Sequence, residues 1–125
     1  MTKKKTFKSF AVHGCRYANK DMKITRLDWI KKYVQYGAKF VVEREPDNEH
    51  DENAIKVKHA LKSGKKMMVG YVPRKLAAEW APLMDEYGWI PDVKFQIKFI
   101  AEKADEEKGV EIGDCTGMML RYPIR

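Results

Sequence analysis

The segment DVKFQIKF, residues 92–99, limits the possible fold most strongly, because apolar and polar side chains alternate along its whole length. Successive side chains of a strand point to opposite faces, so the apolar ones here would all lie on one face. Strands of antiparallel sheets commonly pack one face on a core and leave the other toward water. The segment therefore predicts a half-buried strand in an antiparallel sheet.

Shorter alternating stretches predict further strands. We expect them at about 6–13, 38–45, 54–60 and 67–72, with one or two more within residues 110–125. Gly64 in LKSGKK and the charged run ADEEKG, residues 104–109, are typical of turns. The pattern predicts about six strands.

The segment TRLDWIKKYVQYG, residues 25–37, has apolar residues at helical spacing. Thr25 can cap the start of a helix, with Asp28 three residues later, and Gly37 is a typical stop. We expect a helix over 26–36.

A second helix is expected from Pro73, whose fixed φ suits a first turn, to a stop at Gly88. Pro82 has no N–H and clashes with the preceding turn, so we expect a kink or a restart near Ala81. Two helices and about six strands indicate an α+β fold built on a small, partly closed β-barrel.

The length of 125 residues and the hydrophobic content of 44% suit one domain with one core. We expect that domain to span 1–125, with residues 1–5 as a flexible basic arm. The chain has no apolar run of 18 residues, and its start lacks the pattern of a secretory signal. These features predict a cytoplasmic protein.

The chain is basic, with 25 lysines and arginines against 18 acidic residues and a formal charge of +7. This balance favours a polyanionic partner such as nucleic acid. The cysteines, Cys15 and Cys115, are far apart in the sequence and show no metal-ligand spacing, so we expect free thiols and no zinc site.

The sequence contains no nucleotide-binding loop and no hydrolase or metalloprotease motif. Its three histidines also lack ligand spacing, and we interpret His13 and His59 as strand residues. The chain is therefore expected to be neither an enzyme nor the carrier of a cofactor.

The segment EREPDNEHDENAIKV, residues 43–57, places a charged connection between two predicted strands. Pro46 and Asn48 fit a loop organised by Asx turns. The spacing lacks the central glycine and the terminal glutamate of an EF-hand, which argues against a calcium site.

Two other segments carry residues suited to nucleic acid. In GCRYAN, residues 14–19, Arg16 can grip a phosphate in two bonds and Tyr17 offers a plane for base stacking. In VGYVPRKLA, residues 69–77, Gly70 allows close backbone approach, and Arg74 begins a helix whose N–H groups favour anions.

Together the three segments resemble the HIRAN domain, over about residues 8–100. Such domains occur at the N-terminus of fork-remodelling ATPases and as small stand-alone proteins. The resemblance implies a barrel similar to the OB-fold. It also implies binding of single-stranded DNA at a free 3′-hydroxyl end during DNA repair or replication, with a helicase or nuclease as partner.

The resemblance also implies roles for single residues. Arg16 and Arg74 would contact phosphates, and Tyr17 would stack on the terminal base. Asp51 would accept a hydrogen bond from the 3′-hydroxyl. Because a carboxylate repels a terminal phosphate, Asp51 could distinguish a hydroxyl end from a phosphate end. Tyr71 would line the same pocket.

Two departures from the family pattern stand out. His50 occupies the place where an aromatic residue usually precedes the aspartate, and a histidine stacks less broadly. The helix expected at 26–36 is an insert that would cover the binding groove or extend the core.

Two other functions fit the same residues. The predicted helix could dock a protein through exposed Trp29, Tyr33 or Tyr36. Alternatively, Lys62, Lys65 and Lys66 could bind RNA or duplex DNA without any end pocket.

Overall fold

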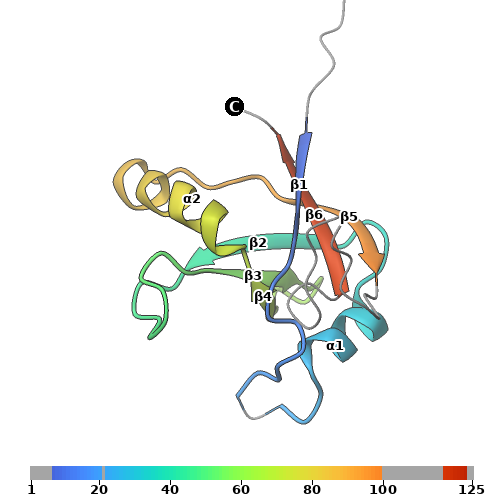
Figure 1. Ribbon diagram of the computed structural model, residues 1–125. Helices are drawn as coiled ribbons and strands as arrows, with labels where there is room; N and C mark the ends of the chain where they lie inside the picture. The colour runs from blue at the N-terminus through green and yellow to red at the C-terminus, as the bar shows by residue number, and fades with distance from the viewer. Residues whose placement is uncertain (1–6, 21, 100–116, 124–125) are drawn as a thin grey trace, which may run out of the picture.

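One antiparallel sheet and two helices make up the computed structural model, which describes residues 7–20, 22–99 and 117–123 (Figure 1). The strands are β1 (Phe7–Ala11), β2 (Lys39–Arg44), β3 (Ile55–Ala60), β4 (Lys66–Tyr71), β5 (Lys94–Phe99) and β6 (Gly117–Pro123). They are hydrogen-bonded in the order β1-β6-β5-β2-β3-β4. The expected α+β fold with about six antiparallel strands is confirmed.

The first helix, α1 (Arg26–Tyr33), begins as expected but ends early. Thr25 and Asp28 form the full capping box. Val34 is already extended, with its N–H donating to the carbonyl of Ile30, so the predicted end at residue 36 is wrong. Val34 is fully buried in its extended conformation. Burial of this side chain in the core therefore opposes the addition of another helical turn.

The second helix, α2 (Arg74–Tyr87), is one continuous element. Pro73 is its N-cap, Gly88 ends it in the left-handed conformation, and Pro82 lies inside it. Of the two alternatives expected near Ala81, a kink or a restart, the restart is therefore wrong. Pro82 is exposed, which lets water reach the backbone carbonyl that the proline leaves unbonded.

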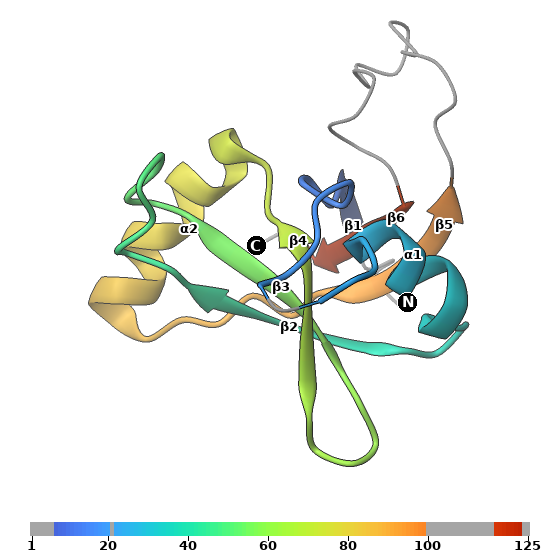
Figure 2. The same cartoon turned by 90° about the horizontal axis from the view of Figure 1, so that it is seen from below.

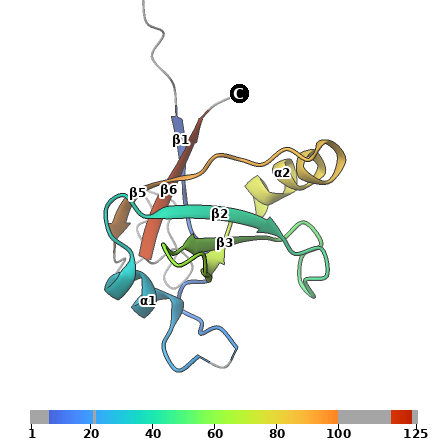
Figure 3. The same cartoon turned by 180° about the vertical axis from the view of Figure 1, so that it is seen from behind.

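Both helices pack on the same face of the sheet, which we call the core face. Trp80 of α2 meets Phe10 and Tyr122 edge-on, with ring centroids 5.8 and 5.0 Å apart. Along β3, buried and partly exposed residues alternate strictly, so one face of that strand belongs to the core. The opposite face of the sheet, the outer face, has no helix in front of β2 (Figure 3).

The sheet does not close into a barrel. Its edge strands are β1 and β4, and the segment that follows β1 meets the end of β4 at the backbone bridge between His13 and Tyr71. The two residues exchange N–H···O bonds of 2.9 and 2.8 Å. The expected barrel is thus supported only as a curved, open sheet, in which β1 and β6 run across β2 and β3 (Figure 1).

Some expectations fall outside the described residues. They concern the basic arm at 1–5, the turn at 104–109, the stretch 110–116 and the thiol of Cys115. Cys15 is buried, and its thiol lies 3.4 Å from the backbone carbonyls of both Val12 and Val69.

Candidate nucleic-acid interface

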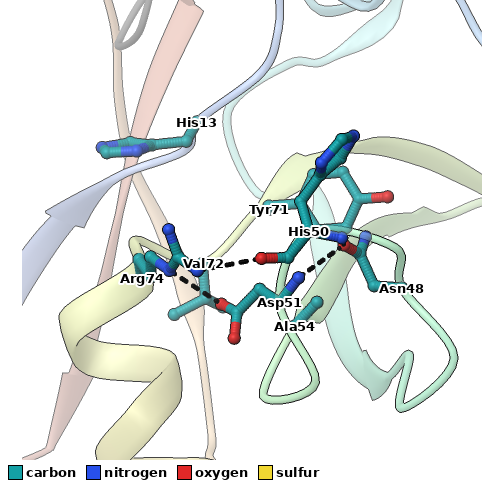
Figure 4. Close-up of a pocket in the computed structure, with 8 residues that line it drawn as sticks. All are labelled: His13, Asn48, His50, Asp51, Ala54, Tyr71, Val72 and Arg74. Carbon is teal, nitrogen blue, oxygen red and sulfur yellow. Dashed lines mark hydrogen bonds and ion pairs between the residues drawn. The ribbon is translucent and has the colours of Figure 1, made fainter.

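A pocket of about 270 Å³ lies where the loop after β2, the end of β4 and the start of α2 meet (Figure 4). Its lining residues are His13, Asn48, His50, Asp51, Ala54, Tyr71, Val72 and Arg74. Four of the six predicted site residues are among them: His50, Asp51, Tyr71 and Arg74. The fold thus brings together residues from two separate sequence segments.

Side-chain caps shape the loop that forms one wall of this pocket. The Oδ1 of Asn48 accepts hydrogen bonds from the backbone N–H groups of His50 and Asp51, at 2.8 and 3.0 Å. The Oδ1 of Asp51 accepts one from the N–H of Asn53 at 2.9 Å. The predicted Asx organisation of the loop is confirmed, and it fixes the direction of Asp51.

Glu45 anchors the same loop to the sheet. Its carboxylate pairs with Lys56 at 3.0 Å and accepts hydrogen bonds from Asn48 at 2.6 Å and from the hydroxyl of Tyr71 at 2.9 Å. Burial alone would raise the pKa of Glu45, but these three donors together hold it below its ordinary value. Burial and the bond to Glu45 raise the pKa of Tyr71, so this hydroxyl stays protonated as a donor.

Arg44 holds the far end of the loop. Its guanidinium donates to the backbone carbonyls of Ala54 and Glu52, at 2.8 and 2.9 Å. It also forms a two-bond ion pair with Asp85 of α2, at 3.0 and 3.1 Å. The loop is therefore fastened to both the sheet and α2, which preorganises the pocket wall.

Asp51 and Arg74 lie next to each other in the pocket and form an ion pair (Figure 4). The Oδ2 of Asp51 lies 3.7 Å from the Nε of Arg74, whose Nη2 donates to the carbonyl of His50 at 2.9 Å. The side chain of Asp51 is 19% exposed and that of Arg74 is 76% exposed. An oriented acceptor thus lies beside a solvent-facing cation.

Arg16 and Tyr17 are not among the residues that line the pocket. Both are exposed, and the guanidinium of Arg16 donates to the Tyr17 hydroxyl at 2.7 Å and lies 4.9 Å from its ring centroid. Arg26 connects this pair to the pocket. Its N–H donates to the carbonyl of Tyr17 at 2.9 Å, and its guanidinium lies 5.7 Å from the ring centroid of Tyr71.

Comparison with protein-family profiles matches the HIRAN domain over residues 7–113, most of the chain. The chain belongs to the HIRAN family. HIRAN domains are in general DNA-binding modules, so the pocket and its surroundings are a candidate DNA interface. No curated protein and no solved structure matches the chain significantly.

Three residues of this HIRAN domain's site were not foreseen as such from the sequence. His13 was interpreted as a strand residue, Asn48 as a turn residue, and Arg26 as part of a helix. His13 reaches the pocket through its bridge to Tyr71, a contact between residues 58 positions apart that no local pattern encodes. Arg26, at the start of α1, is ten positions from Arg16, and no sequence motif singled it out.

Metal sites and membrane-spanning helices find no support in the described part of the chain. Within it, no group of three histidine, cysteine or acidic side chains could hold a metal ion. In the same residues, no helix is long and apolar enough to cross a membrane. Trp29, expected to be exposed for protein docking, instead packs on the core and donates its indole N–H to His59 at 3.2 Å.

Proposed function

We propose that this HIRAN domain binds single-stranded DNA and holds a free 3′-hydroxyl end at the pocket of Asp51 and Arg74. The observation that carries the proposal is the pairing of an oriented carboxylate with an exposed guanidinium in one open depression. The binding would serve DNA repair or replication, beside a helicase or nuclease that acts on the end, and it requires no catalysis by this domain.

The chemistry of the pocket suits a hydroxyl better than a phosphate. One carboxylate oxygen of Asp51 accepts a hydrogen bond from the N–H of Asn53, and the other oxygen faces Arg74. A 3′-hydroxyl can donate to that second oxygen, while the neighbouring phosphate of the strand binds Arg74. A terminal phosphate would meet the carboxylate at short range and be repelled.

The start of α2 adds an anion site next to Arg74. Pro73, the N-cap, makes no side-chain hydrogen bond to the first turn. The N–H groups of that turn therefore remain available to a phosphate, and the helix dipole favours its charge. Lys75, exposed beside Arg74, would add a further cation.

Arg16 and Tyr17 would guide the strand on its way from the pocket. Tyr17 is 53% exposed, and its ring already lies beside a guanidinium. A base can stack on its open face, and Arg16 can contact the adjoining phosphate.

The first test is fluorescence anisotropy with matched oligonucleotides that end in a 3′-hydroxyl or a 3′-phosphate. We expect the wild type to prefer the hydroxyl end about tenfold, the value of one charge-assisted hydrogen bond. Asp51→Asn should remove the preference, because the amide no longer repels phosphate. Asp47→Asn, the same charge change at an exposed position of the same loop, should keep it.

Equal affinity of the wild type for the two ends would refute end recognition. So would a preference that survives in Asp51→Asn. Far-UV circular dichroism of both variants checks that the loop substitutions leave the fold intact.

The second test concerns stacking. Tyr17→Ala should weaken binding of a short single strand by about 1 to 3 kcal/mol. Tyr36→Ala is the matched control, because Tyr36 is also exposed, at 95%, but lies between α1 and β2 and not beside Arg16. Titration of the wild type and both variants with the same single strand measures the affinity of each. Equal losses of affinity in the two variants would show that Tyr17 has no specific role.

A further inference from the structure

A row of cations crosses the outer face of the sheet. Strand register places Arg121 directly opposite Lys94, Lys94 opposite Lys39, and Lys39 opposite Ala60, which in turn faces Lys66. Directly paired residues point to the same face of a sheet. We call the four charged residues, Lys39, Lys66, Lys94 and Arg121, the basic band; all are exposed.

The band is unfavourable for the folded protein by itself. Like charges placed directly opposite each other on neighbouring strands destabilise a sheet. Lys94 has a weak partner in Asp92, at 4.0 Å, and Arg121 lies 5.1 Å from the ring centroid of Phe7. Within the described residues, no carboxylate forms an ion pair with Lys39. An external polyanion would relieve this repulsion.

The band and the pocket have no residue in common. Both helices lie on the core face, whereas the outer face of β2 is uncovered in Figure 3. Beyond Lys66, the turn between β3 and β4 carries exposed Lys62 and Lys65, and it projects away from the rest of the domain in Figure 2. The cations thus continue from the sheet onto the tip of this hairpin.

We propose that the basic band, together with Lys62 and Lys65, binds the phosphate backbone of duplex DNA as a second site. Neighbouring strands are about 4.8 Å apart, so the band reaches about 19 Å across the sheet. A duplex presents a charge about every 1.7 Å along its axis, so it offers several phosphates over that length.

Duplex DNA fits the band better than a single strand does. Single-strand grooves combine cations with aromatic planes on which bases stack. None of the six residues of this site is aromatic, and the ring of Phe7 beside it is already in contact with Arg121. Cations without stacking partners are the means by which proteins hold duplex DNA independently of its sequence.

The test uses a covalently closed duplex minicircle with an internal fluorophore, because it has no 3′ end for the pocket. The variant Lys39→Gln/Lys66→Gln/Lys94→Gln is compared with Lys8→Gln/Lys23→Gln/Lys32→Gln, which loses the same charge elsewhere. We expect the band variant to bind the minicircle at least about tenfold more weakly at 0.1 M salt. Its plot of log affinity against log salt should be less steep by about 3, one for each lysine lost.

Unchanged affinity and slope in the band variant would overturn the proposal. It is also overturned if the control triple weakens binding as much, or if a single-stranded circle loses as much affinity as the duplex. Asp51→Asn should bind the minicircle as the wild type does, so failure of end recognition leaves this test intact. Thermal unfolding of the band variant checks folding, and its Tm should equal or exceed that of the wild type because opposed charges are gone.

Discussion

The acidic residues of the segment 43–57 differ in their surroundings. Glu45 is an anchor that binds Lys56, Asn48 and Tyr71, whereas Asp51 faces the pocket beside Arg74. Asp47 and Glu49 are exposed. One charged segment thus contains a residue that anchors the loop, a candidate residue for recognition of the 3′-hydroxyl, and solvated side chains. Only the tertiary contacts distinguish these roles.

His59 is a second residue whose role the sequence concealed. It lies in β3, as expected of a strand residue, but it is only 5% exposed. Its ring stacks on Phe40 with centroids 5.4 Å apart, and its Nδ1 accepts the indole N–H of Trp29. That bond requires an unprotonated Nδ1, and burial lowers the pKa of His59 accordingly.

His59 should therefore make stability depend on pH. The folded pKa is depressed, so below about 6.5 the unfolded chain binds a proton that the folded chain resists. Stability is fully present above that pH and falls as the pH decreases, by up to about 1.4 kcal/mol per pH unit. Urea unfolding between pH 7.5 and 5.5 measures the slope.

The variant His59→Gln should flatten this slope, because its amide does not titrate. His50→Gln, the same substitution at an exposed position, is the matched control and should leave the contribution of His59 in place. If His59→Gln retains the wild-type slope, the burial of His59 is not the cause of the pH dependence of stability.

At the scale of elements, the decisive contact is the bridge between the end of β4 and the segment after β1. Gly70 permits it: its φ is 155°, and a Cβ added there would overlap Val12 and the carbonyl of His13. The expectation of close backbone approach at Gly70 was right. The approaching backbone is the chain's own, so this glycine builds the pocket wall rather than contacting a phosphate.

Gly70→Ala should therefore destabilise the domain by about 3 kcal/mol, because the new methyl group meets fixed backbone in a strained conformation. Gly64→Ala is the control, since Gly64 also has a positive φ, of 92°, but nothing lies within 4 Å of the added Cβ. We expect Gly64→Ala to lower the free energy of unfolding by only about 1 kcal/mol, through backbone strain. Chemical denaturation of both variants measures the difference, and equal losses would mean that the close approach is unimportant.

At the scale of the whole molecule, the open sheet divides the surface into a core face and an outer face. The core face carries both helices, and the pocket forms where α2 begins and the two edges of the sheet approach. The outer face carries the basic band. A chain of 125 residues can thus present, as proposed, both a pocket for a strand end and a separate surface for duplex DNA.

The sequence by itself determined the strands, both helix starts, the Asx-capped loop and the family. These features depend on local causes: side-chain alternation, a capping box, and polar side chains that bond to nearby backbone. The end of α1 was mispredicted because burial of Val34 competes with Gly37 as a stop. At Pro82 the sequence left a kink and a restart of α2 open, and the continuous helix rules out the restart, because a helix tolerates proline where solvent reaches the backbone carbonyl left unbonded.

Only the tertiary structure decided which residues share a site. His13 joins the pocket through a bridge to a strand edge, and Arg26 reaches Tyr71 across a loop. The basic band depends on the pairing of β2 with β5, far apart in the sequence, and on its register. A shift of one residue in that register would turn Lys39 away from Lys94, because side chains alternate between faces. Such long-range pairing is set by packing of the whole core, and no single segment of the sequence encodes it.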